Sequence, residues 1–245
     1  MSKKNKIYFT SDFHLGAPNH TESIKREKKI CLWLDNIKND AKEIYLVGDI
    51  FDFWFEYKTA IPKGFERLKG KLCELTDSGV TIHFFPGNHD LWTFGYLEKE
   101  LGLIIHKKPL TTEIYGKTFY IAHGDGLGRG DFTYTIIKNI FNNNICQYLF
   151  STIHPNIGIW LAKVWSKKSR NKGGFNKANI VRNQLINYSK EILKNQNINY
   201  FIFGHIHEPI EIELNQFCKY INIGDCISHF SFLELDESNL LIKYF

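Results

Sequence analysis

The sequence predicts an α/β fold, in which strands and helices alternate along the chain. Within the first 90 residues, three short apolar segments are separated by two longer segments whose apolar residues recur at helical spacing. Further along, short apolar segments flank turn residues, a pattern typical of hairpins. The chain has 245 residues, of which 43% are hydrophobic and 15% aromatic. That is enough apolar material for one well-filled domain, residues 1–245.

The first five elements follow from local patterns and from the residues that end them. A glycine follows each of the last three elements and ends it. In two of these cases a serine or a proline stands beside the glycine. Polar residues follow the carboxyl end of each strand, where ligands of open α/β sheets gather. The predicted elements are a strand at 6–10, a helix at 22–37, a strand at 43–47, a helix at 65–77 and a strand at 80–85.

The later chain changes character. Residues 111–115 and 118–122 flank a turn at Gly116 and Lys117, which predicts a hairpin. Residues 131–193 are predicted to be mostly helical. No internal repeat and no linker rich in Pro or Ser is visible in the sequence. The remaining predicted strands lie at 200–203, 211–214, 219–223, 230–235 and 240–244.

Charge and cysteine content limit the classes of partner and compartment. The net charge of +5 suits an anionic substrate or membrane surface and does not by itself indicate nucleic acid. Basic residues are not interleaved with aromatic residues along a groove, so nucleic-acid cleavage is not expected. The five cysteines form no CxxC pair, which favours free thiols in a reducing cytosol. No apolar run approaches the roughly 20 residues of a spanning helix, so a soluble or peripherally attached protein is expected.

Five segments share one format, an apolar strand followed by a loop with side chains that bind metals. Carboxylates, imidazoles and an amide together suit divalent Mn, Fe, Zn or Mg. Each segment alone is weak evidence, but five in order, each at a strand end, predict a convergent metal site. The segments are Asp12-x-His14, Gly48-Asp49, Gly87-Asn88-His89-Asp90, His123-Gly124-Asp125 and Gly204-His205-x-His207.

This ordered set resembles the signature of the calcineurin-like metallophosphoesterase superfamily: D-x-H, G-D-x-x-D, G-N-H-D/E, H and G-H-x-H. The resemblance spans nearly the whole chain and implies a four-layer sandwich, with two mixed sheets face to face and helices outside. It also implies two divalent metal ions that activate water and neutralise charge on the phosphate oxygens. Asp12, His14 and His207 would hold one ion, Asn88, His123 and His205 the other, and Asp49 would bridge both.

The same resemblance implies two catalytic residues beside the ligands. His89 would contact the phosphoryl group or help the leaving group depart. Asp52 would orient His89. A helix cap is an equally weighted alternative for Asp52, because Asp is favoured at that position.

Three further features bear on the substrate. The segment after Asp49 is unusually aromatic, and the segment after His123 leads to Asp131 and Tyr134. An insertion rich in Ile, Phe, Leu and Trp is predicted to be helical and to run into a basic loop at 166–174 that contains Ser and Gly. An apolar helical lid that ends in such a loop would suit a molecule with acyl chains and a phosphate.

Together these features resemble the family of bacterial UDP-2,3-diacylglucosamine pyrophosphatases. The resemblance implies hydrolysis to UMP and 2,3-diacylglucosamine 1-phosphate in lipid A biosynthesis, with Mn²⁺ as the usual metal. It implies a lipid-linked nucleotide as partner, peripheral attachment to the cytoplasmic face of the inner membrane, and no obligate protein partner. The implied lid is residues 131–175. The implied substrate contacts are Asn88, His89, Asp131, Tyr134, Ser169, Arg170 and Lys172.

The chain departs from that family at two positions. The best-known members carry Arg where this chain has His89, and they tend to have Glu where Asp52 stands. A soluble phosphoesterase acting on nucleotides or phosphoproteins is therefore the alternative, and exposed apolar surface within residues 136–165 would discriminate against it. The basic run could instead be a solvated loop, and the apolar face ordinary core. An inactive metal-binding scaffold is disfavoured, because every ligand and His89 are present.

Overall fold

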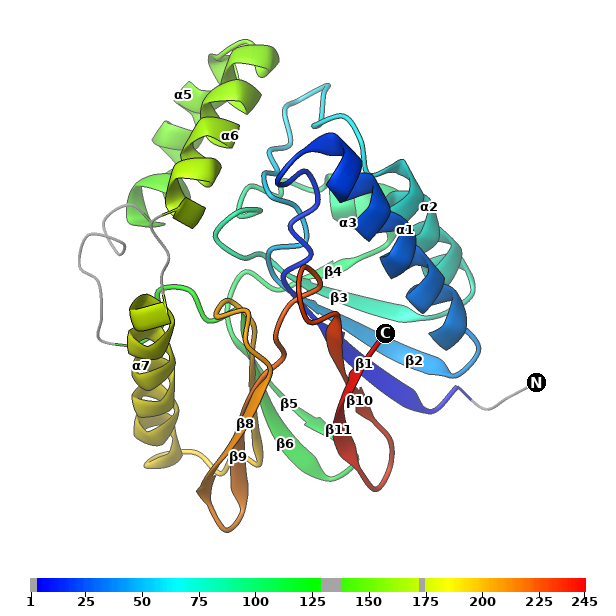
Figure 1. Cartoon of the computed structure of the whole chain (residues 1–245), viewed down its shortest axis with the longest axis vertical. Coiled ribbons are helices and arrows are strands. Elements are labelled where there is room, and N and C mark those ends of the chain that lie inside the picture. Colours follow the sequence, from blue (N-terminus) through cyan, green and yellow to red (C-terminus); the bar gives the residue numbers. More distant parts are fainter. Residues whose placement is uncertain (1–3, 129–137, 172–174) are drawn as a thin grey trace.

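Two β-sheets lie face to face in this protein, and helices cover their outer sides (Figure 1). The computed structural model describes residues 4–128, 138–171 and 175–245. The first sheet contains β1 (Lys6–Thr10), β2 (Ala41–Val47), β3 (Thr81–Phe85), β4 (Ile104–Ile105), β10 (Ser231–Leu235) and β11 (Leu240–Tyr244). The second sheet contains β5 (Leu110–Ile114), β6 (Lys117–Ile121), β7 (Tyr200–Phe203), β8 (Ile210–Asn215) and β9 (Cys218–Asn222).

Both sheets mix parallel and antiparallel pairs. The first has the order β11-β10-β1-β2-β3-β4, in which β1 to β4 run parallel and β10 joins β1 antiparallel. The second has the order β5-β6-β7-β9-β8, in which β6, β7 and β9 run parallel. Parallel neighbours need crossover connections. Helices α1 (His20–Ile37) and α2 (Glu66–Asp77) provide them from β1 to β2 and from β2 to β3, and α7 (Phe175–Leu193) precedes β7.

Three apolar layers hold these elements together. Alternate side chains of a strand point to opposite faces, so Phe9 lies between the sheets, stacked on Tyr45 with 4.8 Å between ring centroids. Tyr8 points outward to Trp33 of α1. Helices α1, α2 and α3 (Tyr96–Leu101) pack on the outer face of the first sheet, and α7 packs on the second. The predicted α/β sandwich of four layers is confirmed.

Helices α2 and α3 begin without a side-chain cap of their own, and a buried carboxylate from elsewhere takes its place. Glu27 accepts hydrogen bonds from the N–H groups of Arg67 and Leu68 at 3.0 and 3.1 Å. Glu56 accepts one from Tyr96 at 3.0 Å. A carboxylate is favourable there because the first N–H groups of a helix are unpaired and carry partial positive charge. The sequence does not predict α3 or β4, since the signal that starts α3 is 40 residues away.

The described residues between β6 and β7 are mainly helical, as predicted. Helices α5 (Asn144–Thr152) and α6 (Pro155–Asn171) lie side by side at one end of the molecule (Figure 1), with Gly158 of α6 against α5. Pro155 begins α6, where its missing N–H has no penalty. Residues 166–171 are the last part of α6, so the prediction that they belong to a loop is wrong. Lys and Arg are good helix formers, and no Gly or Pro stands among these residues.

All five cysteines are free, as the sequence predicts. Within the described part of the chain, no helix combines the length and the apolarity that crossing a bilayer requires.

Candidate metal centre

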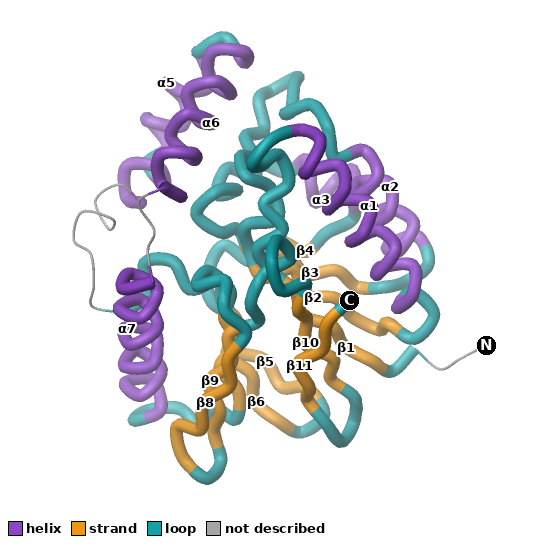
Figure 2. The backbone as a smooth tube through the Cα atoms, in the orientation of Figure 1, coloured by secondary structure: helices purple, strands orange, loops and turns teal. Residues whose placement is uncertain are grey.

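The predicted ligands lie in loops that leave one common edge of the two sheets. The carboxyl ends of β1, β2 and β3 meet those of β6, β7 and β9 at this edge, where loops are concentrated (Figure 2). Asp12, Asp49 and Asn88 follow the three strands of the first sheet. His123 and His205 follow β6 and β7. Parallel pairing therefore brings together residues that are far apart in sequence.

The backbone at five of the predicted ligands has an uncommon conformation. Asp12, His14, Asp49, His205 and His207 have φ angles between 43° and 71°, in the left-handed region that non-glycine residues rarely adopt. Only three other non-glycine residues in the described ranges share it. Such residues cost about 1–3 kcal/mol each and cluster where function requires a particular side-chain direction. The strain therefore indicates a functional site independently of the motifs.

Two glycines let these loops approach one another closely. A methyl group added at Gly48 would collide with the ring of His123. One added at Gly204 would lie 2.6 Å from Asp12 Oδ2. Only glycine lets the backbone pass this close to another side chain. The glycines of the motifs are therefore part of the site's geometry.

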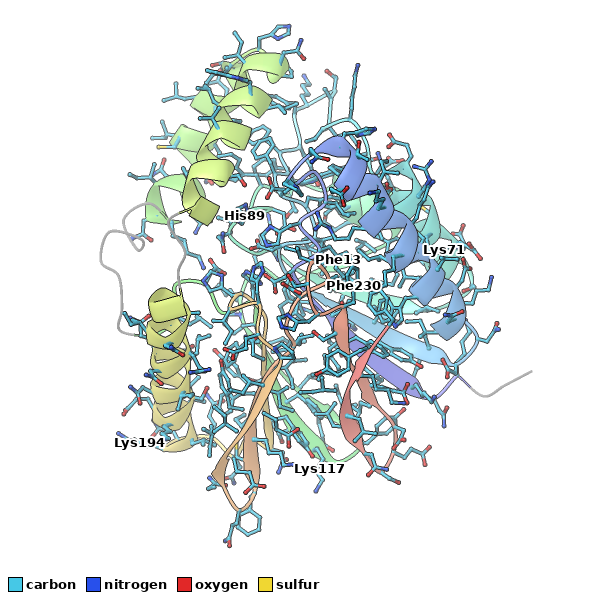
Figure 3. All side chains as sticks on the ribbon, viewed as in Figure 1. Phe13, Lys71, His89, Lys117, Lys194 and Phe230 are labelled. Atoms are coloured by element: carbon cyan, nitrogen blue, oxygen red, sulfur yellow. The ribbon has the colours of Figure 1, made fainter. Side chains whose placement is uncertain are left out.

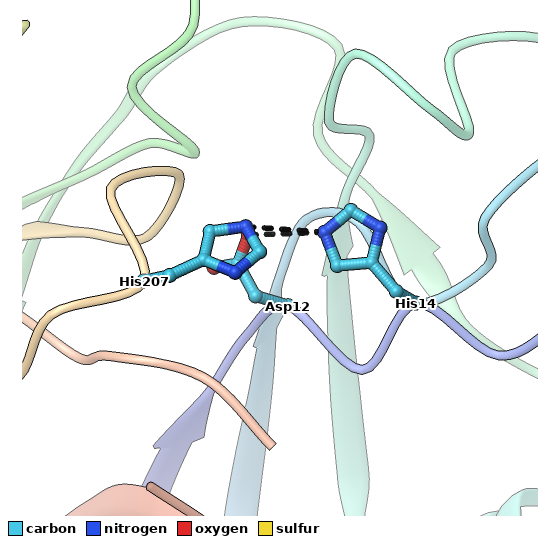
Figure 4. A group of neighbouring side chains, drawn as sticks. All are labelled: Asp12, His14 and His207. Carbon is cyan, nitrogen blue, oxygen red and sulfur yellow. Dashed lines mark hydrogen bonds and ion pairs between the residues drawn. The ribbon is translucent and has the colours of Figure 1, made fainter. Parts of the chain in front are cut away.

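The first group of converging side chains consists of Asp12, His14 and His207 (Figure 4). The Nε2 atoms of His14 and His207 are 3.2 Å apart. Oδ1 of Asp12 lies 3.2 Å from Nε2 of His207 and 3.7 Å from Nε2 of His14. Three donor atoms this close can surround one cation. We call this group the first metal position.

The second group consists of Asp49, His123 and His205. Oδ2 of Asp49 lies 3.3 Å from His123 Nε2 and 3.6 Å from His14 Nε2, so one oxygen faces both groups. An oxygen in this place could bridge two ions. Asn88, which is predicted to join this group, has a buried Oδ1 without a hydrogen-bond partner among the described residues, and the N–H of its neighbour His89 bonds Oδ1 of Asp49 at 2.8 Å. We call His123, His205 and Asn88 the second metal position, a candidate like the first, with Asp49 between the two.

His123 is oriented to coordinate through one particular nitrogen. Its Nδ1 lies 2.8 Å from the backbone carbonyl oxygen of Val47. A carbonyl oxygen only accepts hydrogen bonds, so Nδ1 carries a hydrogen, and in the neutral ring the lone pair is on Nε2. That Nε2 is buried and has no hydrogen-bond partner in the described chain. Metal-binding histidines are commonly held in this way by a backbone carbonyl.

A buried carboxylate joins the loops that carry Asp49 and Asn88. Asp90 accepts hydrogen bonds from the N–H of Ile50 at 2.8 Å and from that of Gly87 at 2.7 Å. Burial and the neighbouring charge of Asp49 raise the pKa of Asp90 to about 7. Because one side chain bonds both loops, the ligands after β2 and β3 are held at a fixed separation.

The electrostatics of the site favour positive charge. Burial opposes protonation of His123, but Asp49 outweighs it and raises the pKa of this histidine to about 10. Burial is likewise outweighed at His207, where Asp12 raises the pKa to about 10. At His205, burial and the charge of His123 lower the pKa to about 4, which keeps this ring neutral and able to coordinate. Carboxylates that stabilise imidazolium in this way would also stabilise a metal cation.

The donor set fits divalent metal ions. Oδ1 of Asp12, Oδ1 of Asn88 and Nε2 of His123 are buried without hydrogen-bond partners in the described ranges. Buried polar atoms are nearly always partnered, so several unpartnered atoms at one point indicate a ligand site. Carboxylate, amide and imidazole donors are those that Mn, Fe, Zn and Mg accept.

His89 lies at the rim of these groups, near the end of α6 (Figure 3). Its ring centroid is 4.8 Å from that of His14. Its Nδ1 lies 3.0 Å from the backbone oxygen of Asp52 and 3.1 Å from Oγ of Ser166. Because the carbonyl oxygen only accepts, Nδ1 carries a hydrogen, and Nε2 is the nitrogen left to bind another group.

The carboxylate of Asp52 lies closer to His14 and Ser166 than to His89. Its Oδ1 is 3.4 Å from Nδ1 of His14 and 3.8 Å from Nδ1 of His89. Its Oδ2 accepts a hydrogen bond from Ser166 at 3.0 Å. The alternative of a helix cap is wrong, since the next described helix begins only at Glu66. Asp52 therefore reaches His89 through its backbone and His14 through its side chain.

The structure does not place the predicted substrate contacts of the lid. Asp131, Tyr134 and Lys172 lie outside the described residues. Ser169 and Arg170 are described only as part of the α6 backbone. Their predicted contacts with substrate therefore stay predictions.

Three residues of the site receive no role from the sequence. They are Asp90, Ser166 and Asp225. Asp225 follows a strand and a glycine, the same format that identifies Asp49, and this signal could have identified it. Ser166 has no such signal, because its place depends on how α6 packs.

Helices α5 and α6 have one side packed on the protein. Phe150 of α5 packs against the rings of both Phe55 and Trp92, with 4.9 Å between centroids in each case. Gly158 of α6 lies against the hydroxyl of Tyr57, and a methyl group there would collide with it. An aromatic cluster thus supports the helix pair near the metal groups.

The other side of the helix pair exposes apolar side chains. Four of them on α6 recur at helical spacing and so share one face. The alternative in which this apolar face is ordinary core is therefore wrong for these residues. The exposed apolar surface that would distinguish a lipid enzyme from a soluble phosphoesterase is present. The exposed residues of the pair are Ile145, Tyr148, Leu149, Ile157, Trp160, Leu161 and Val164, and Ile140, which precedes α5, is exposed as well.

Known proteins resemble this chain over nearly its full length. The UDP-2,3-diacylglucosamine hydrolase of Porphyromonas gingivalis is 37% identical to it, over 98% of this chain and 97% of that protein. The UDP-2,3-diacylglucosamine hydrolase of Actinobacillus succinogenes is 25% identical, over 98% of this chain and 99% of that protein. Among solved structures, the phosphoesterase Yfce from E. coli is 15% identical with a TM-score of 0.45, over 98% of this chain and 92% of that one.

A family-level match covers most of the chain. The sequence profile described as Calcineurin-like phosphoesterase matches residues 5–209. The matched range contains all the residues of both metal positions, from Asp12 to His207. The chain belongs to the calcineurin-like phosphoesterase family.

Proposed function

We propose that this chain hydrolyses the pyrophosphate of UDP-2,3-diacylglucosamine to UMP and 2,3-diacylglucosamine 1-phosphate, a step of lipid A biosynthesis. The substrate assignment rests on the 37% identity, over 98% of this chain, to a relative named UDP-2,3-diacylglucosamine hydrolase. The exposed apolar face of α5 and α6 supports it, since acyl chains need such a surface. A soluble phosphoesterase for nucleotides or phosphoproteins would have no use for that face.

The proposed cofactor is a pair of divalent ions, most simply Mn²⁺, one at each metal position. Asp49, whose Oδ2 faces both positions, would bridge them. When bound, such ions would activate water for attack on phosphorus and offset the charge of the phosphate oxygens. The protein's part is to hold the donor atoms in place, which the strained loops and the close-packed glycines do.

His89 is the proposed residue for the phosphoryl or leaving group. Its Nδ1–H is held by the carbonyl of Asp52 and the hydroxyl of Ser166, so Nε2 would meet a phosphate oxygen. Burial lowers the pKa of His89. The negative charge of a bound phosphate acts in the opposite direction. Protonation of His89 would therefore accompany substrate binding, which prepares a proton for the departing group.

Residues 131–175 are proposed as a lid inserted in a single domain, residues 1–245. The exposed face of α5 and α6 would cover the acyl chains, and the contact between Ser166 and His89 would place the lid beside the phosphates. Residues at the two ends of the lid would bind the sugar and the phosphates. These proposed contacts are Asp131, Tyr134, Ser169, Arg170 and Lys172.

The same apolar face suits peripheral attachment to the cytoplasmic side of the inner membrane, where the lipid substrate resides. The net charge of +5 would add attraction to anionic lipid head groups. We propose neither a nucleic-acid ligand nor an obligate protein partner for this chain.

The proposed function is tested by incubating the purified protein and Mn²⁺ with three compounds. They are UDP-2,3-diacylglucosamine, UDP-N-acetylglucosamine, which lacks the two long acyl chains, and p-nitrophenyl phosphate. We expect UMP from the diacylated compound and little turnover of the other two. Equal or faster turnover of the two compounds without long acyl chains would overturn the lipid assignment and favour the soluble phosphoesterase. A sample with chelator instead of Mn²⁺ measures turnover that needs no metal.

A further inference from the structure

Asp225 contacts the first metal position from outside. It follows β9 and is 3% exposed. Its Oδ1 accepts hydrogen bonds from the N–H groups of Ser228 and His229, both at 2.9 Å, and so closes a turn. Its Oδ2 lies 3.4 Å from Nδ1 of His207. The backbone N–H groups hold one carboxylate oxygen, which aims the other at the histidine.

The opposite nitrogen of His207 faces the proposed metal. Its Nε2 lies 3.2 Å from Oδ1 of Asp12 and 3.2 Å from Nε2 of His14. A histidine that coordinates through Nε2 must carry its hydrogen on Nδ1. A carboxylate beside Nδ1 favours that tautomer and makes the ring a stronger ligand. Asp225 occupies this place.

The second metal position lacks this kind of support at His123. There the acceptor for Nδ1–H is the uncharged carbonyl oxygen of Val47, at 2.8 Å. At the first position both histidines have a carboxylate beside Nδ1, since Asp52 Oδ1 is 3.4 Å from His14. Removing the carboxylate of Asp225 should therefore affect one position and not the other.

We propose that Asp225 is a positioning residue that fixes the ring of His207 for coordination and so strengthens metal binding at the first position selectively. The inference rests on the two-metal part of the proposed function and not on the identity of the substrate. Its test is therefore metal binding itself, measured without substrate.

The variant Asp225→Asn tests this role with little change of shape. It keeps one oxygen for the turn but directs an N–H donor toward Nδ1 of His207. The metal-free protein is titrated with Mn²⁺ by calorimetry, and the wild type should show two binding events. In the variant one event should weaken by roughly 10- to 100-fold, the range for lost partners of metal-binding histidines. The same substitution in an Asn88→Ala background, which disables the second position, assigns the weakened event to the first.

A matched control and a second variant separate positioning from folding. Asp236→Asn alters a similar turn, in which Oδ1 accepts from Ser238 and Asn239 at 2.8 and 2.7 Å. This turn is at the end of β10 distant from Asp225, so both events should keep their affinity. Asp225→Ser retains a hydroxyl that can accept from the turn but does not reach His207, and it should behave like Asp225→Asn.

The possible outcomes are distinct. Fewer than two events in the wild type would reject the two-metal proposal itself. Two events that both persist unchanged in Asp225→Asn, or that weaken equally, would reject the inference alone. If neither Asp225 variant folds, as judged by circular dichroism, Asp225 serves the turn rather than the histidine, and the inference is rejected.

Discussion

The hydroxyl of Ser166 donates a hydrogen bond to the carboxylate of Asp52 at 3.0 Å, although 114 residues separate them in the chain. Ser166 lies on α6, whose outer face is apolar, and Asp52 lies beside His14 and His89. The bond therefore links the helix pair to the residues around the metal positions. A change in the position of α6 would therefore alter the contacts of Asp52 and His89.

Replacing Ser166 by Ala should lower kcat/KM for the lipid substrate. A hydrogen bond to a charged group contributes about 1.5–3 kcal/mol, which corresponds to roughly 10- to 100-fold if it is present in the transition state. Thr, which keeps a hydroxyl, should restore part of the rate. Ser151→Ala is the matched control, since that hydroxyl bonds a carbonyl of its own helix α5. Equal kinetics in Ser166→Ala and the control would remove the bond from the mechanism.

Replacing Asp49 by Ala should abolish metal binding and activity together. One oxygen of this carboxylate faces His14 and His123, so its loss removes a donor from both metal positions. Calorimetric titration with Mn²⁺ should show no event in the range where the wild type binds. The unfolding temperature in chelator, compared with that of wild type, checks that the variant folds. Activity that persists with full metal occupancy would contradict the bridging role.

Replacing His89 by Ala should lower kcat without loss of metal. A positioned acid or base contributes about 10²- to 10⁴-fold, whereas the metal positions retain all their proposed ligands. Steady-state kinetics and Mn²⁺ calorimetry on the same preparation measure the two effects. If the rate stays within a few-fold of wild type, His89 is not the group that acts on the phosphate.

The same substitution should have opposite effects in two helices. A methyl group at Gly70 of α2 meets nothing within 4 Å, so Gly70→Ala should stabilise the protein by about 0.5–1 kcal/mol. At Gly158 of α6 it collides with Tyr57 and lies 3.2 Å from Phe150. Gly158→Ala should therefore displace α6 and lower lipid turnover, with urea unfolding as the measure of stability. Full activity in Gly158→Ala would show that α6 can shift without consequence.

Stability should fall in mild acid through a histidine that belongs to neither metal position. Burial and the charge of neighbouring His83 lower the pKa of His106 from 6.5 to about 4. Between these values the unfolded chain binds a proton that the folded chain does not, so folding stability is present above pH 6.5 and is lost as pH falls toward 4. Glu43, which also contacts His83, has its pKa lowered to about 2, so it stays charged throughout this window.

The variant His106→Phe removes this titration and keeps a ring next to Phe85. Its free energy of unfolding should fall less between pH 7 and pH 5 than that of wild type. Urea unfolding in chelator at both pH values measures the difference. An identical pH dependence in the two proteins would mean that another group accounts for the acid sensitivity.

The sequence by itself determined the sandwich and the identity of the residues that meet at its edge. Strands β1, β7 and β11 lie at the predicted residues, and Asp12 and His207 lie in one group of converging side chains. This was possible because the signals are local. An apolar run specifies a strand, a glycine ends it, and the next polar residue is carried to the common edge by parallel pairing.

Only the tertiary structure decided which atoms face one another around that edge. Asp52 reaches His89 through its backbone, Ser166 enters the site from α6, and Asp225 faces the outer nitrogen of His207. The start of α3 likewise depends on Glu56, far away in sequence. Such contacts depend on how helices and sheets pack, because the direction of a side chain relative to a distant residue is a property of the whole fold and of no local pattern.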